Sequence, residues 1–78
     1  MSARLVMVTW HDAHSSAAAD FDAATHHRPC VMHTVGWLVQ KDDAGVTVAC
    51  ERYEEGGDWQ YRAPTFIPLA MVQKIGKP

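Results

Sequence analysis

Two groups of side chains in this sequence carry atoms that commonly bind metals. His11, Asp12 and His14 lie close together near the start, and residues 26–30 supply two further imidazoles and a thiol. Imidazole, carboxylate and thiolate are the usual donors to transition metals, so the first group could hold a catalytic metal in a small enzyme. The spacing matches no specific zinc motif, however, and we therefore expect neither a metal site nor a cofactor.

Nucleophilic catalysis has even less support. Ser15 and Ser16 follow His14, but neighbours in sequence do not make a nucleophile and its base, and no oxyanion-hole motif is present. Serines at this point are explained by capping a following helix. Gly56 and Gly57 fall in a predicted hairpin rather than between a strand and a helix, which excludes a phosphate-binding loop there. The sequence favours a protein that is not an enzyme.

The same N-terminal group is better suited to binding. Trp10 ends a predicted strand beside a polar segment, so its indole is expected to be a half-exposed contact residue. Polar contacts beside it would come from His11, Asp12, His14 and Ser15. The other tryptophans, Trp37 and Trp59, are expected to lie in the core.

The central strand of the predicted fold covers residues 30–40. It is rich in β-branched residues and shows no helical repeat. Both of its faces are apolar, whereas a strand in a small sheet usually shows one polar face to water. Something must therefore cover the second face, that of Cys30, Met32 and Leu38: a helix of this chain, a second copy or a ligand.

The other elements follow from similar patterns. Residues 5–10 predict a first strand, and residues 17–24, rich in alanine, predict a short helix that ends before Pro29. Turns are expected over 42–45, with Gly45 at a positive backbone angle, and over 54–58. Later strands are expected over residues 46–53, 59–63 and 71–75, with a tight turn or single helical turn at 67–70.

The hairpins predict a strand register. Lys41 opposite Val46 would bring Val48 opposite Val39 and Cys50 opposite Trp37. Glu51 and Arg62 would then form an exposed cross-strand ion pair. The two cysteines, Cys30 and Cys50, are expected to be buried thiols rather than a disulfide framework.

Composition limits the class of protein. The 78 residues make one domain, 1–78, and the elements predict a mainly β protein: a small five-stranded barrel with one short α-helix between strands 1 and 2. The net charge of −2 and scattered basic residues argue against binding duplex DNA. No segment approaches membrane-spanning length and no signal-peptide pattern is present, so we expect a cytoplasmic protein.

The C-terminal third resembles the end of a Src-homology-3 (SH3) domain, in residues 57–61 (Gly-Asp-Trp-Gln-Tyr), 67–68 (Ile-Pro) and 71–72 (Met-Val). The resemblance implies an SH3-like barrel. The tyrosine expected soon after the proline is replaced around Met71, so it does not imply peptide binding. Sm-like barrels, which share the strand order and often form rings, are the alternative.

A second resemblance covers most of the chain. Residues 8–15 (Val-Thr-Trp-His-Asp-Ala-His-Ser), 34–39 (Thr-Val-Gly-Trp-Leu-Val), 42–43 (Asp-Asp) and 67–68 (Ile-Pro) look like short proteins of tailed bacteriophages, mostly of unassigned function. This resemblance implies an accessory protein that works in the cytoplasm of the infected bacterium. It does not supply a mechanism.

Three functions are compatible with these observations. The first is a non-catalytic phage accessory protein that binds and modulates a host protein. The second is a homo-oligomer that encloses a small anionic ligand, such as a nucleotide signal of bacterial immunity, between aromatic and arginine side chains. The third is a small metal-dependent enzyme that uses His11, Asp12 and His14. Binding of single-stranded nucleic acid suits the aromatic residues but not the charge.

Overall fold

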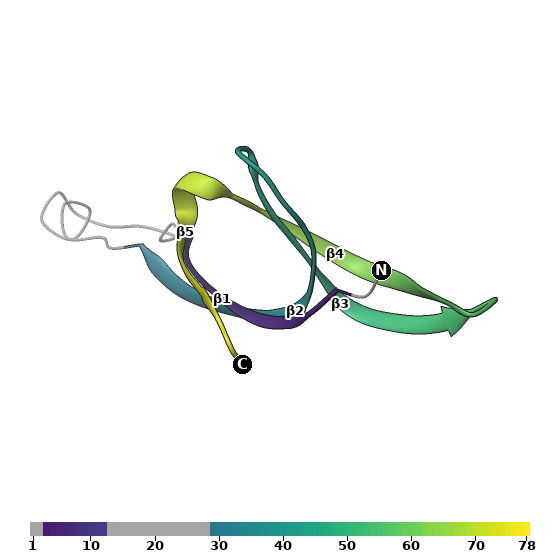
Figure 1. The fold of residues 1–78 in the computed structure, drawn as a ribbon. Coiled ribbons are helices and arrows are strands. Elements are labelled where there is room, and N and C mark those ends of the chain that lie inside the picture. Colours follow the sequence, from purple (N-terminus) through teal and green to yellow (C-terminus); the bar gives the residue numbers. More distant parts are fainter. Residues whose placement is uncertain (1–2, 13–28) are drawn as a thin grey trace, which may run out of the picture.

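The computed structural model describes residues 3–12 and 29–78, which form five strands and one short 3-10 helix (Figure 1). The strands are β1 (Leu5–Asp12), β2 (Cys30–Lys41), β3 (Gly45–Glu55), β4 (Asp58–Pro68) and β5 (Val72–Gly76), and the helix η1 spans Leu69–Met71. The helix predicted over 17–24 lies outside the described residues, as do His14 and Ser15.

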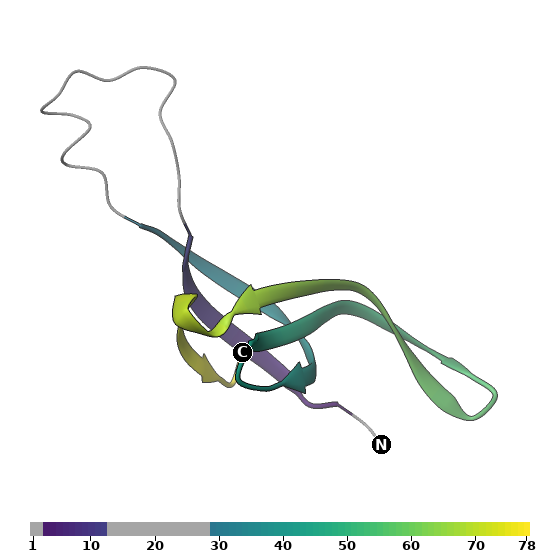
Figure 2. The ribbon, with the colours of Figure 1, turned by 90° about the horizontal axis from the view of Figure 1, so that it is seen from above.

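All five strands belong to one antiparallel sheet in the order β4-β3-β2-β1-β5. The sheet curves round on itself, and the β3–β4 hairpin projects well beyond the curved part (Figures 1 and 2). The curvature is that of a small barrel, but the sheet is not closed. The prediction of a mainly β fold with five short strands is therefore confirmed.

The core lies inside this curve and is built from a few branched side chains. Val6 and Val8 of β1, Val46 and Val48 of β3, and Ile67 of β4 are almost completely buried. Partly buried side chains pack around them: Trp10, Leu38, Met71, Val72 and Ile75. The alternation of Val6 with Val8 and of Val46 with Val48 gives each strand one inner face, as period-two patterning requires.

A β-bulge changes the predicted register between β2 and β3. Lys41 does lie opposite Val46, but β2 has one extra residue between Leu38 and Gln40, where Val39 has no partner. Trp37 consequently faces Ala49 instead of Cys50.

A one-residue shift of this kind moves side chains to the other face of the sheet. The prediction that every large apolar side chain of both strands shares one face is therefore wrong. The expectation of buried thiols is also wrong, because Cys30 and Cys50 are free and exposed.

The turn between β2 and β3 is held by a side chain. The Asp42 carboxylate accepts hydrogen bonds from the backbone N–H groups of Ala44, at 2.9 Å, and Gly45, at 3.2 Å. Gly45 does not adopt the predicted positive angle; among the described glycines only Gly56 and Gly57, in the β3–β4 turn, do so. Gly45 is needed for close packing, since a Cβ there would lie 2.3 Å from the carbonyl oxygen of Ile67.

The fourth strand runs further than predicted. It continues through Pro64, which lies opposite Ala49, to Pro68. Because β4 is at the edge of the sheet, the missing N–H of a proline leaves no partner unsatisfied. Ala63 has a positive φ of 53°, but β3 and β4 keep the same register on both sides of it. The predicted register, with Glu51 opposite Arg62, is confirmed, whereas the ion pair between them stays a prediction. The Arg62 guanidinium lies 6.0 Å from the centroid of the Tyr53 ring.

Candidate binding surface

The predicted binding residues do not form one surface. The strand predicted to end at Trp10 continues to Asp12, so Trp10, His11 and Asp12 are successive strand residues. Successive side chains of a strand point to opposite faces, which puts Trp10 and Asp12 on the core side and His11 on the outside. His14 and Ser15, the other predicted contacts, lie outside the described residues.

Trp10 is half-buried, and its contacts are structural. The indole packs against the core cluster. Its N–H donates a hydrogen bond of 3.0 Å to the hydroxyl of Thr34 on β2. A partly buried indole N–H needs such a partner, and Thr34 is well placed because it lies opposite Val8, the residue before Trp10 on the same face of β1.

A different surface, formed by β1 and β2 together, is open. Leu5 lies opposite Trp37, and every second pair along the two strands has the same orientation. Eight side chains therefore lie on the side of β1 and β2 that faces away from the core. We call this side the outer face. Its members are Leu5, Met7, Thr9, His11, Val31, His33, Val35 and Trp37.

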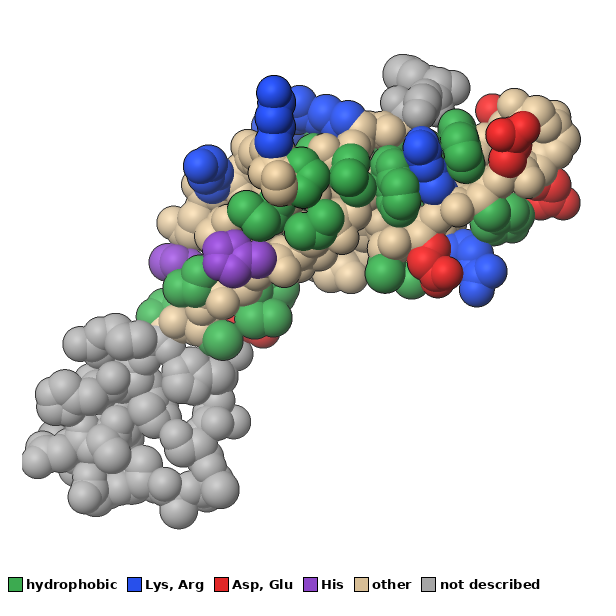
Figure 3. All heavy atoms as spheres, turned by 90° about the horizontal axis from the view of Figure 1, so that it is seen from below, with side chains coloured by type: hydrophobic (Ala, Val, Ile, Leu, Met, Phe, Trp, Pro, Cys, Tyr) green, Lys and Arg blue, Asp and Glu red, His purple; other side chains and the backbone are tan. Residues whose placement is uncertain are grey.

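The outer face is apolar and accessible. Val31 is 54% exposed, Val35 50% and Leu5 46%. Viewed from below Figure 1, hydrophobic side chains gather over this part of the molecule, with histidines towards one end and basic side chains along a border (Figure 3). Scattered apolar side chains are normal on a surface, but a contiguous group on two paired strands indicates an interaction site.

Few polar groups interrupt this surface. Thr9 and His33 lie directly opposite one another and share a hydrogen bond of 3.2 Å between the hydroxyl and Nδ1. Lys74 of β5 is opposite Thr9 on its other side, and its side chain turns towards Gly76. No acidic residue belongs to the outer face, and Lys74 supplies a positive charge at its border.

An arginine joins two tryptophans at one end of the outer face. The guanidinium carbon of Arg52 lies 4.8 Å from the centroid of the Trp37 ring and 3.9 Å from that of Trp59. Trp59 is 37% exposed, so the prediction that Trp37 and Trp59 are both core residues is wrong. Both distances are within the range of cation–π attraction. We call these three residues the Trp-Arg-Trp stack.

Sequence reasoning missed the stack but held one signal for the outer face. The signal was that both faces of β2 are apolar, so one of them needs a cover. The predicted assignment is wrong, however: the face of Val31, Val35 and Trp37 was expected in the core and that of Met32 and Leu38 outside, whereas Leu38 packs on the core and Val31 and Val35 are exposed. Within residues 3–12 and 29–78, no element covers the face of Val31 and Val35. The stack was missed because the position of Trp37 relative to Arg52 and Trp59 depends on the β2 bulge, which has no simple sequence pattern.

The histidine and cysteine residues do not gather into a metal centre in the described part of the chain. No group of three or more His, Cys, Asp or Glu side chains that could hold an ion occurs there. His11 and Asp12 point to opposite faces of β1, so those two cannot chelate one ion together. The thiol of Cys30 donates to the thioether of Met32 at 3.7 Å.

None of the described segments is a helix with the length and apolar character needed to span a membrane.

Comparison of the chain with protein-family models, with curated proteins and with solved structures finds no match in any of the three.

Proposed function

We propose that this chain is a non-catalytic binding protein that docks a partner protein on the outer face of β1 and β2. The observation that carries the proposal is the exposure of Val31, Val35 and Leu5 side by side on paired strands. Removing such a group from water contributes roughly 25 cal/mol for each Å² of apolar area, from which the entropy cost of association is subtracted.

The composition of this surface suits a protein rather than a small ligand. Small molecules are bound in concave sites, whereas the outer face is one side of a sheet. Tryptophan and arginine are the residue types most enriched among binding hot spots, and the Trp-Arg-Trp stack supplies both. An arginine held between two rings also loses less side-chain freedom on binding than a free one does.

The charges indicate what kind of partner fits. Lys74 lies at one border and Arg52 at one end, and the outer face itself carries no acid. The complementary surface is apolar with acidic side chains around it. The resemblance to tailed-phage proteins suggests a bacterial host protein, and we propose the SH3-like or Sm-like barrel as the scaffold that presents the surface.

The test uses the protein and one surface variant as baits. Val35→Asp places a charge in the middle of the outer face at a half-exposed position, so the fold should tolerate it. Both baits are incubated with bacterial lysate, and the captured proteins are identified and quantified. We expect the wild type to capture one partner in stoichiometric amount and Val35→Asp to lose it.

A matched control is Leu69→Asp. Leu69 is 42% exposed, similar to Val35, but belongs to η1 and not to the outer face. Equal loss of the partner with both variants would overturn the proposed surface. Sedimentation equilibrium of the purified protein provides a further test: a dimer that dissociates on Val35→Asp substitution would assign this face to a second copy of the chain instead.

A further inference from the structure

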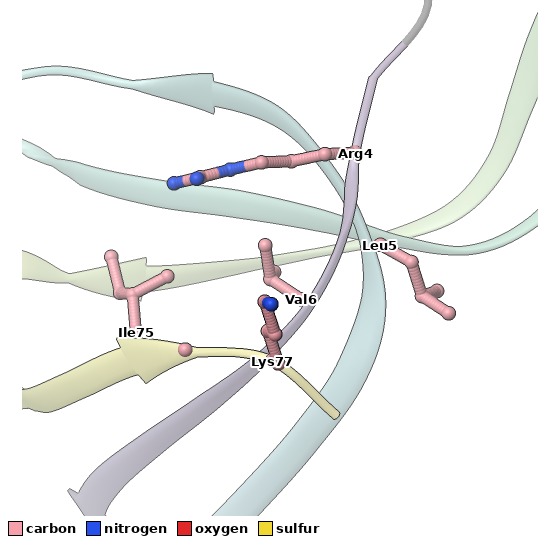
Figure 4. A pocket seen from close by; sticks show the side chains of 6 residues that line it. Arg4, Leu5, Val6, Ile75 and Lys77 are labelled. Atoms are coloured by element: carbon pink, nitrogen blue, oxygen red, sulfur yellow. The ribbon is translucent and has the colours of Figure 1, made fainter.

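A cavity lies on the other side of β1, at one open end of the core. It has a volume of about 310 Å³ and is lined by six residues (Figure 4). The lining residues are Arg4, Leu5, Val6, Ile75, Gly76 and Lys77. It forms because β1 and β5 are antiparallel, with Met7 opposite Gly76 and Val8 opposite Ile75. The start of β1 and the end of β5 therefore lie side by side.

The lining combines an apolar wall with two positive charges. Val6 is buried and Ile75 packs against the core, so both are fixed. Arg4 and Lys77 are the charged residues of the lining, and none of the six side chains is acidic. In Figure 4 the Arg4 side chain extends across the cavity above Ile75, and Lys77 lies close to Val6.

The backbone that carries these cations is held in place. The carbonyl oxygen of Arg4 accepts a hydrogen bond of 2.9 Å from the N–H of Leu38, and the N–H of Ala3 donates one of 2.9 Å to the hydroxyl of Tyr61. On the other side, the pairing of β5 with β1 extends to Gly76, next to Lys77. With the backbone fixed, it is chiefly the exposed side chains of Arg4 and Lys77 that lose freedom when a ligand binds.

From this geometry we infer that the cavity binds a nucleoside 5′-monophosphate. The guanidinium of Arg4 and the ammonium of Lys77 suit a phosphate group, the first through paired hydrogen bonds and the second as a point charge. The apolar wall of Val6 and Ile75 suits the flat face of a base. A volume of about 310 Å³ is at the lower end of the range for small-molecule sites, which fits one nucleotide and not a nucleic-acid chain.

The cavity shares Leu5 with the outer face, but its other apolar residues do not belong to that face. Val6 and Ile75 belong to the core side of the sheet, whereas Val35 belongs to the outer side. Val35→Asp should therefore leave nucleotide binding unchanged, and the two proposals can fail separately.

The experiment is titration calorimetry with four probes: AMP, UMP, adenosine and inorganic phosphate. We expect one or both nucleotides to bind more tightly than adenosine or phosphate alone, and more weakly as salt is raised. Arg4→Gln and Lys77→Gln should each weaken binding by about tenfold, the loss of one charge-assisted contact. The matched controls Arg62→Gln and Lys41→Gln remove exposed cations elsewhere and should have no effect.

Amide NMR spectra locate the ligand without any substitution. We expect the nucleotide to shift the signals of Val6, Ile75 and Gly76. The inference is overturned if neither nucleotide binds, if phosphate alone binds as tightly, if the control variants weaken binding equally, or if the shifted signals cluster at Trp37 and Trp59.

Discussion

The indole N–H of Trp10 and the hydroxyl of Thr34 are joined by a hydrogen bond of 3.0 Å between neighbouring strands. This bond is on the core side of the sheet, beside the buried Val8. It explains why a tryptophan can occupy a half-buried position in so small a core.

Replacing Thr34 by valine should destabilise the protein by about 1 kcal/mol, because the shape is kept while the partner of the indole N–H is lost. Urea denaturation followed by circular dichroism measures the change. Thr65→Val, at an exposed position on β4, is the control and should change stability by less than about 0.5 kcal/mol. Equal effects of the two substitutions would show that the bond contributes nothing.

Gly36 is required by close approach of two strands. A Cβ at this position would lie 2.3 Å from the backbone oxygen of Ala49, which cannot move aside easily. Gly36→Ala should therefore cost about 3 kcal/mol, at the upper end of the range for overpacking. At Gly76 the nearest atom to an added Cβ belongs to the flexible Lys74 side chain, at 3.6 Å, so Gly76→Ala should leave the stability almost unchanged. Thermal denaturation of both variants measures the difference. A neutral Gly36→Ala would contradict the β2–β3 geometry.

The turn at Asp42 depends on its side chain. Its carboxylate accepts two backbone N–H groups and also a hydrogen bond of 3.0 Å from the side chain of Gln40. Asp42→Ala should lower the free energy of unfolding by about 1 kcal/mol, whereas Asp42→Asn, which keeps an acceptor oxygen, should retain most of it. Chemical denaturation of the three proteins checks this order, and an alanine variant as stable as the asparagine variant would contradict it.

The Trp-Arg-Trp stack gives a fourth prediction. Two exposed cation–π contacts are worth about 0.5 to 1 kcal/mol each, so Arg52→Gln should destabilise the protein by about 1 kcal/mol or more. It should also change the tryptophan fluorescence, since Trp37 and Trp59 both lose the cation. Arg62→Gln, whose ring contact at 6.0 Å is at the limit of the interaction, should have less than half the effect. An unchanged fluorescence spectrum would show that the stack does not persist in solution.

The strands and part of their pairing were predictable because they depend on local chemistry. β-branched runs predicted β1, β2 and β3, and the short turns predicted Lys41 opposite Val46 and Glu51 opposite Arg62. The bulge at Val39 was not predictable, since the inserted residue is an ordinary strand former. The continuation of β4 through Pro64 was not predictable either, because a proline is tolerated there by the edge position of β4, which depends on tertiary structure.

For the candidate site, the sequence predicted an apolar face on β2 that needs a cover but assigned it to the wrong side of the strand, because the face of Trp37 was expected in the core and proves to be the open one. The position of Trp37 relative to Arg52 depends on the bulge, and so the stack appeared only in three dimensions. The predicted group at Trp10, His11 and Asp12 was divided between two faces once β1 proved to continue to Asp12.

The most direct test of the central claim is the affinity of the purified partner for wild type, Val35→Asp and Leu69→Asp, measured by titration calorimetry. A charge in the centre of a desolvated apolar contact should weaken binding by at least about tenfold, whereas the η1 variant should bind like the wild type. Equal affinity of all three proteins for the partner would contradict docking on the outer face of β1 and β2.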